Sequence, residues 1–466
     1  MEYFTLLGAS TAVIAVLAMA LYRQRGDLGL VAGIAALYYW SLYGGWSIVI
    51  DKTGGFSGQH YQYLEHKMFP VALDGEYLQT LALYSGFIVI VELTLLAALS
   101  RRRPRPIPRL VLRHDAILLL GFVAAIASFL VIRDKLSMAW AINTSAYGYT
   151  RSQGDQWFTL HQVLNRVALI PPAIGMATLA AGRRSRFFVN VERRYTWPAY
   201  ATLAACMGAF IFVLGNKNEG FTALLAGVLT YAGSVRRAQW WKIGLALGCG
   251  IWFLASVDFF RGTPLSAMGT ALFTRSQDSG DVSHFVTTSN EAFAAHFSMY
   301  GVLAAGTEPR FGYSLYSLAC SVIPRVLWPN RPRDIYLYYS ESVGTIQNQG
   351  YSLHHATGWY LNFGYAGVAL GAVVLGLIWA GCLNAHQRIC PLSGLLYRLF
   401  ATIAPWVLVA GLPPLIRAGP EGYKGLIIES FLIPVGVLAF ACRAKRARKK
   451  EVEWEPERQW AMQETP

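Results

Sequence analysis

The sequence predicts an all-α protein, a polytopic bundle of transmembrane helices that forms a single integral-membrane domain. Of its 466 residues, 54% are hydrophobic and 14% are charged, whereas an average soluble domain has about 25% charged residues. Apolar runs of about 20 residues, enough for a helix to cross a hydrocarbon core of about 30 Å, recur along the whole chain. These two observations exclude an ordinary soluble enzyme.

Uninterrupted apolar stretches predict about eleven spans. They lie at 4–22, 28–50, 77–99, 115–133, 163–182, 197–214, 220–234, 243–259, 358–382, 397–412 and 425–442. No basic segment precedes the first run and no small-residue cleavage site follows it, so we expect a retained span and not a signal peptide. The predicted membrane domain covers residues 1–442, and a basic tail follows at 443–466.

The basic residues alternate between the connections. Short segments after every second span hold 25 of the 40 Lys and Arg residues, at 23–25, 101–113, 183–194, 236–242, 388–398 and 443–458. By the positive-inside rule the C-terminus is then cytoplasmic and the N-terminus lies outside. The net charge of +14 is therefore interpreted as a topology signal and not as a nucleic-acid surface.

The long and chemically varied segments fall on the outer side, and function is expected there. The largest is an insertion at 260–357, between spans eight and nine. Its apolar amphipathic pieces at 291–306 and 313–327 predict helices that lie at or dip into the outer membrane surface, over the bundle. The cytoplasmic connections have no Walker A loop, kinase signature or GxGxxG, so nothing points to work driven by ATP.

Arginine is the first candidate for binding, because a guanidinium fork recognises phosphate through two hydrogen bonds. The run at 323–333 carries Arg325, Arg331 and Arg333 between three prolines, and we expect it to line an anionic site. Further outer candidates are Arg275, Arg310 and Arg417. For any one of these side chains, contact with solvent or lipid headgroups is the alternative.

A second candidate is the turn at 215–220, which interrupts a long apolar stretch. A charge at membrane depth costs about 2.5 to 3.5 kcal/mol and is usually kept for function or for a partner. Lys217 could reach a buried phosphate, or it could simply pair with Glu219.

His354 and His355 precede the ninth predicted span. A histidine at that edge can deprotonate a hydroxyl near neutral pH, although many such histidines are interfacial hydrogen-bond donors. Glu219 and Glu421 are rival catalytic carboxylates. Glu421 shares a short loop with Arg417 and Lys424, and the three could form only a structural ion network.

No metal or cofactor is expected. The outer segments contain no Asp-x-Asp motif that could bind a divalent cation. The nearest alternative for such a site is the set Asp278, Asp281 and His284. Gly280 lies within this set and argues against the helix that would align the three side chains. The six cysteines have no CxxC or zinc-ligand spacing, so we expect free thiols.

Three motifs carry a resemblance to a known family. They are Gly312-Tyr313-Ser314 running into IPRVLWPNRP at 323–332, NFGYAGVALG at 362–371, and GNKNEGFTALLAG at 215–227. With these motifs the chain resembles the Wzy-type O-antigen and exopolysaccharide polymerases of bacteria, over about residues 200–440.

The resemblance implies a glycosyltransferase of the GT-C type on the outer side of the bacterial inner membrane. Undecaprenyl-diphosphate-linked oligosaccharides would be donor and acceptor, and undecaprenyl diphosphate would be released without a metal. It also implies that Lys217 and Arg325 hold the diphosphate, that His354 or His355 is the base, and that a chain-length regulator is a partner. Many relatives carry a carboxylate where this chain has Thr357 and Gly358.

Two alternatives remain open. An O-antigen ligase would use the same donor and the same basic residues. A flippase or other transporter needs polar residues deep in many spans, whereas charge within the spans is sparse here, apart from Glu92, Arg166, Glu429 and the turn that holds Lys217.

Overall fold

The computed structural model describes residues 1–54, 71–100, 109–152, 156–215, 217–235, 238–260, 263–268, 291–321, 323, 328, 330–345, 352–389 and 393–444. Within these ranges, nine helices are long and apolar enough to cross a membrane. They are Glu2–Arg25, Leu28–Ile50, Gly75–Ala98, His114–Ala141, Leu160–Arg184, Thr196–Leu214, His355–Arg388, Leu395–Ile416 and Gly422–Ala441. The prediction of a multi-pass helical membrane protein is therefore confirmed.

The seventh and eighth predicted spans are also helices, α10 (Lys217–Ser234) and α11 (Trp240–Phe260). They are not among the nine helices that satisfy both criteria for a span. That these two helices also cross the membrane stays a prediction, and so does the inside-outside orientation.

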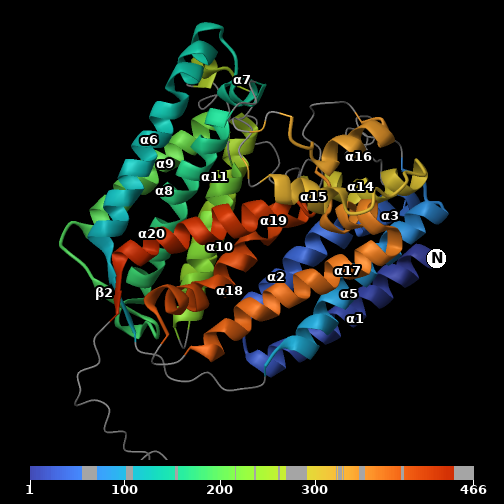
Figure 1. The fold of residues 1–466 in the computed structure, drawn as a ribbon, viewed down its shortest axis with the longest axis horizontal. Helices are drawn as coiled ribbons and strands as arrows, with labels where there is room; N and C mark the ends of the chain where they lie inside the picture. Colours follow the sequence, from blue (N-terminus) through green and yellow to red (C-terminus); the bar gives the residue numbers. More distant parts are fainter. Residues whose placement is uncertain are drawn as a thin grey trace, which may run out of the picture.

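The helices form two groups, joined by α18 (Leu395–Ile416) (Figure 1). In the first group α5 (Gly75–Ala98) packs against α1 (Glu2–Arg25) and α17 (His355–Ala385). In the second group α8 (Gln156–Ala181) packs against α6 (His114–Ala141) and against α10. Helices α9 (Thr196–Leu214) and α11 lie beside them. Because α18 contacts α2 (Leu28–Tyr38), α17 and α10, the seam between the groups runs along it.

Polar caps and glycines set the helix boundaries. The Oδ1 atom of Asp27 accepts a hydrogen bond from Gly29 N at 2.8 Å and caps α2, and Asp74 caps α5 through Tyr77 N at 2.9 Å. Gly26 ends α1 with φ of 62°, a left-handed conformation that suits glycine. Two of the described helical segments are π-helices. The first, η1 (Tyr39–Tyr43), continues into α3 (Gly44–Gly54). The second, η5 (Gly425–Leu432), continues into α20 (Ile433–Ala441).

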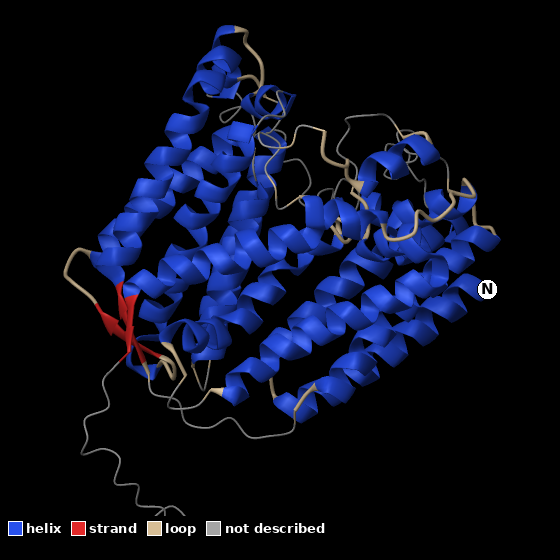
Figure 2. Ribbon diagram, viewed as in Figure 1, coloured by secondary structure: helices blue, strands red, loops and turns tan. Residues whose placement is uncertain are grey.

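Three short strands form a sheet that the all-α prediction missed (Figure 2). Strand β1 (Leu110–Arg113) lies between β2 (Phe188–Val191), which is parallel to it, and β3 (Cys442–Ala444), which is antiparallel. All three strands come from segments that the basic-residue pattern assigns to one side of the membrane. The sheet thus brings these segments to one end of the bundle, which we call the sheet end.

The opposite end, called the cap end, carries the described helices of the predicted insertion (Figure 1). They are α14 (Glu291–Ala304), α15 (Tyr313–Cys320) and α16 (Ile335–Val343). Every residue from 294 to 302 is buried, and α14 packs against η1, α5 and α17. The piece predicted at 291–306 is thus a helix packed over the bundle, as expected, and residues 294 to 302 are part of the protein core. Its depth relative to the membrane surface stays a prediction.

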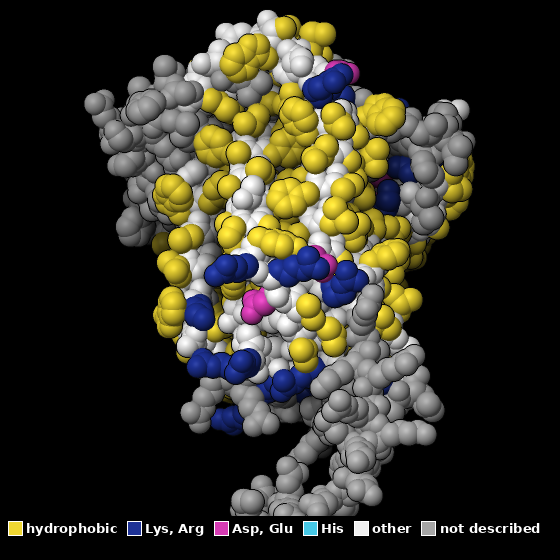
Figure 3. All heavy atoms as spheres, turned by 90° about the vertical axis from the view of Figure 1, so that its left-hand side faces the viewer, with side chains coloured by type: hydrophobic (Ala, Val, Ile, Leu, Met, Phe, Trp, Pro, Cys, Tyr) yellow, Lys and Arg dark blue, Asp and Glu magenta, His cyan; other side chains and the backbone are white. Residues whose placement is uncertain are grey.

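The side of the molecule formed by the second helix group is broadly apolar above a belt of Lys and Arg (Figure 3). On α6, apolar side chains are exposed along one face, among them Leu119, Val123 and Ile126. A band of exposed apolar side chains that ends at a basic belt is typical of a lipid-facing surface.

Candidate functional site

The turn at 417–421, which follows α18, is fixed to the segment at 352–355, which precedes α17. The amide of Leu353 donates a hydrogen bond to the carbonyl of Arg417 at 3.1 Å, and the amide of Gly419 donates to the carbonyl of Leu353 at 3.1 Å. Residues that are over 60 positions apart in the sequence therefore meet at the cap end. Most of the candidate chemistry predicted from the sequence lies on or beside this junction.

His355 supports the turn through its imidazole ring. Its Nδ1 atom donates to the carbonyl of Gly419 at 2.9 Å, so Nε2 is the accepting nitrogen of a neutral ring. Nε2 accepts from the indole of Trp359 at 3.1 Å and from the hydroxyl of Tyr423 at 3.2 Å. With both nitrogens occupied and the side chain buried, His355 is held in one orientation.

His354 is equally buried and caps α17. Its Nδ1 atom accepts from the amide of Ala356 at 3.1 Å, so Nε2 donates to the hydroxyl of Ser41 at 3.0 Å. Burial lowers the pKa of His354 well below the ordinary value, and the neighbouring His355 and His296 lower it further.

His296, on α14, is a buried polar residue that no pattern in the sequence singled out. Its Nδ1 atom donates to the carbonyl of Ser41 at 2.7 Å, and its Nε2 atom accepts from the hydroxyl of Tyr77 at 3.0 Å. Burial lowers its pKa to about 4, so the ring is neutral at physiological pH. Ser41 thus links His296 to His354 under the cap.

The two carboxylate oxygens of Glu421 differ in their hydrogen bonding. Its Oε1 atom accepts from the amide of Ile335 at 3.1 Å, which joins the turn to α16. Its Oε2 atom is buried and has no hydrogen-bond partner in the part of the chain that the structure describes. Burial raises the pKa of Glu421 to about 8, so the carboxyl group titrates in the range where general bases work.

A cavity of about 360 Å³ opens at the cap end between α2, α10 and α18, and Lys217, Asn218 and Arg417 line it. The guanidinium of Arg417 donates to the Asn218 side chain at 3.1 Å. Tyr39 and Trp40 also line this cap-end cavity, and the rest of its wall is mainly apolar and reaches Leu229. Because Leu229 is 12 residues after Lys217 on α10, the cavity extends about 18 Å along the helix.

The structure brings some of the predicted residues together and separates others. Lys217 and Arg417 line one cavity, and Glu219 is buried in the first turn of α10 beside them. In the cap, Arg310 lies over the ring of Tyr338, 3.8 Å from its centroid, and Arg331 donates to the carbonyls of Ser321 and Ile323. Arg333 is exposed in the cap, and Arg275 and Arg325 lie outside the described residues.

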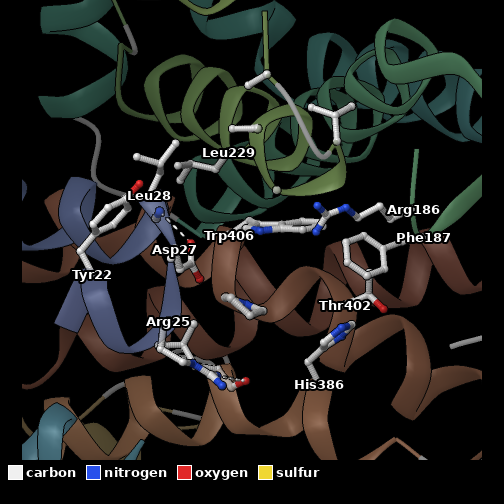
Figure 4. A pocket seen from close by; sticks show the side chains of 18 of the residues that line it. Tyr22, Arg25, Asp27, Leu28, Arg186, Phe187, Leu229, His386, Thr402 and Trp406 are labelled. Carbon is white, nitrogen blue, oxygen red and sulfur yellow. Dashed lines mark hydrogen bonds between the residues drawn. The ribbon is translucent and has the colours of Figure 1, made fainter. Parts of the chain in front are cut away.

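A cavity larger than the cap-end cavity lies at the sheet end, where no site was expected. It has a volume of about 900 Å³. Figure 4 shows Arg186 and Phe187 on one side and Asp27 and Leu28 on the other, with Trp406 between them. Leu229 lines this sheet-end cavity as well as the cap-end cavity, so that side chain stands between the two cavities within the seam between the helix groups.

The described ranges contain no group of three or more His, Cys, Asp or Glu side chains placed to hold a metal ion. Asp278, Asp281 and His284 lie outside those ranges. The five cysteines that the structure describes are free, as predicted for them. No family model, curated protein or solved structure matches this chain.

Proposed function

We propose that this protein is a glycosyltransferase that joins oligosaccharide repeat units carried on undecaprenyl diphosphate, at the outer face of a bacterial plasma membrane. The observation that carries the proposal is the cap-end cavity. A lipid-linked donor has an anionic diphosphate between a sugar and a long apolar chain. The cavity has two cationic side chains, Lys217 and Arg417, at one end and an apolar wall that leads about 18 Å into the bundle.

In this proposal Lys217 and Arg417 hold the diphosphate and stabilise the charge that develops on it as the leaving group departs. The apolar wall between α2, α10 and α18 receives the first isoprene units. Tyr39 and Trp40, which line the same cavity, offer rings for apolar contact.

We take Glu421 as the base, because it follows Arg417 by four residues in the turn beside the cap-end cavity. Its Oε2 atom has no partner among the described residues, whereas the ring nitrogens of His354 and His355 are all hydrogen-bonded. The ionised carboxylate takes the proton of the acceptor sugar hydroxyl, and the hydroxyl oxygen bonds to the anomeric carbon of the donor. The bond from that carbon to the diphosphate oxygen breaks, and undecaprenyl diphosphate leaves with the electron pair. His355 positions the turn that carries Glu421.

A transporter of lipid-linked oligosaccharide is the second candidate, and one observation favours it. Leu229 lines both the cap-end and the sheet-end cavity, so cavities lie along the seam on both sides of this side chain. A transporter would move its substrate along that seam and leave the glycosidic bonds intact.

Product analysis separates these functions. Purified protein is incubated with a synthetic undecaprenyl-diphosphate oligosaccharide in the presence of EDTA. A ladder of repeat units with released undecaprenyl diphosphate supports the polymerase. Transfer only to an added separate acceptor indicates a ligase, whereas transbilayer movement in liposomes without bond exchange indicates a transporter.

A further inference from the structure

A third cavity, of about 280 Å³, lies at the sheet end, where the end of α8 approaches the start of α11. Three cationic side chains line it: Arg183 and Arg184, from the turn after α8, and Lys242, from the first turn of α11. Tyr231 of α10 contributes to its wall. We call this cavity the basic pocket.

The positive charge of the basic pocket has no counter-charge among the described residues. None of the side chains that line it is a carboxylate. Within the same ranges, Arg183 and Arg184 have no hydrogen bond or ion pair. The ammonium of Lys242 lies 5.9 Å from the ring centroid of Tyr231 and 5.7 Å from that of Trp241. Three like charges around one concavity repel one another, and a bound anion removes that cost.

The position of the basic pocket indicates which kind of anion fits. Arg184 is the last residue of the candidate span Leu160–Arg184, so the pocket lies where a helix leaves the hydrocarbon region. Trp240 and Trp241, which begin α11, are 62% and 65% exposed beside it. Exposed tryptophans are typical of the membrane interface, at the depth of the lipid headgroups.

We propose that the basic pocket binds the phosphate of an anionic phospholipid, in the leaflet that the charge pattern predicts to be cytoplasmic. Arg183, Arg184 and Lys242 contact the phosphate, and Trp240 and Trp241 lie against the upper acyl chains. Basic pockets between helices on that side of a membrane are suited to acidic headgroups. This site is separate from the cap-end cavity and does not depend on the proposed transfer reaction.

Native mass spectrometry of the detergent-purified full chain tests the site, with dioctanoyl phosphatidylglycerol, dioctanoyl phosphatidylcholine and inorganic phosphate as three separate probes. Wild-type protein is expected to retain phosphatidylglycerol in preference to phosphatidylcholine. The R183A/R184A double variant is expected to bind phosphatidylglycerol about 30-fold more weakly, since each basic residue near an anionic surface contributes roughly 1 kcal/mol. Both arginines are exposed, so the double variant should keep its melting temperature.

The matched control is R109A/R194A, which removes two exposed arginines at the same end that do not line the pocket. This control is expected to bind phosphatidylglycerol as the wild type does. Equal binding of the two lipids by wild-type protein overturns the proposal, and so does an equal loss in both double variants. Displacement of phosphatidylglycerol by inorganic phosphate at similar concentration also overturns it, because the pocket would then be a site for soluble anions.

Discussion

His355 and Gly419 are joined by a hydrogen bond of 2.9 Å from the imidazole Nδ1 to the backbone carbonyl, and this bond ties the start of α17 to the turn after α18. The turn carries both Arg417, which lines the cap-end cavity, and Glu421, whose Oε2 atom has no hydrogen-bond partner among the residues described. The orientation of one buried ring therefore sets the position of two residues of the proposed site.

The substitution H355A should lower both stability and activity. It leaves the Trp359 indole and the Tyr423 hydroxyl without this partner, and each buried polar group left unpaired costs about 1 to 3 kcal/mol. The Gly419 carbonyl loses one of its two hydrogen bonds and keeps the one from the amide of Gly422. Thermal unfolding of the purified variant should show a clearly lower melting temperature. A variant that loses activity at an unchanged melting temperature would instead make His355 the catalytic base.

Gly358 should tolerate no side chain. A β-carbon there would lie 2.5 Å from Cδ of Pro420 and 2.8 Å from Cα of Gly419, so G358A should push the turn away and destabilise the protein by about 1 to 3 kcal/mol. G381A is the matched control on the same helix, because nothing lies within 4 Å of its added carbon. We expect G381A to be neutral or slightly stabilising. Equal melting temperatures for the two variants would contradict the close contact of α17 with the turn.

Glu421 should make both activity and stability depend on pH. Its pKa of about 8 lies above the ordinary value of 4.5, so the folded protein holds a proton that the unfolded chain has lost. The free energy of unfolding should therefore fall as the pH rises from about 4.5 to 8. Transfer activity should rise over the upper part of this range, because the base must be ionised.

The E421Q variant checks both effects. It should abolish the transfer activity and remove this part of the pH dependence of unfolding, measured by denaturation at several pH values. An E421Q variant with wild-type activity would remove Glu421 from the mechanism and return attention to His354 and His355.

Glu92 should be a source of instability. It lies on α5 and is fully buried, and within the described ranges neither carboxylate oxygen has a hydrogen-bond partner. Replacement by leucine removes a buried unsatisfied group and should raise stability by about 1 to 3 kcal/mol, with transfer activity retained. The check is thermal unfolding together with the transfer assay. Loss of activity in E92L would reveal a function for this carboxyl group, as a transporter would require.

The helical bundle was predictable because each span is a local feature. An apolar run of about 20 residues identifies itself without reference to the rest of the chain. The sheet was not predictable in this way, because Leu110 pairs with Phe188 and Leu112 with Cys442. Strands of four residues or fewer carry little periodicity, and these partners are distant in the sequence.

The candidate site was predictable in its residue types but not in their arrangement. Lys217, Arg417 and Glu421 could be selected as charged residues at span ends. The hydrogen bonds of Arg331 to backbone carbonyls could not be foreseen, nor could the burial of His296, since both depend on tertiary packing. The sheet-end cavity has no local signature, because its lining comes from segments distributed along the whole chain.

The most direct test of the proposal that the cap-end cavity binds the diphosphate is the rate of repeat-unit polymerisation by the wild type, K217A and R417A. Both residues line the cap-end cavity, and loss of a group that stabilises the leaving charge should slow the transfer by roughly 10²-fold. R133A, an exposed arginine outside that cavity, is the control and should match the wild type. Wild-type ladders from both K217A and R417A, at normal expression, would contradict the assignment of the cap-end cavity as the diphosphate site.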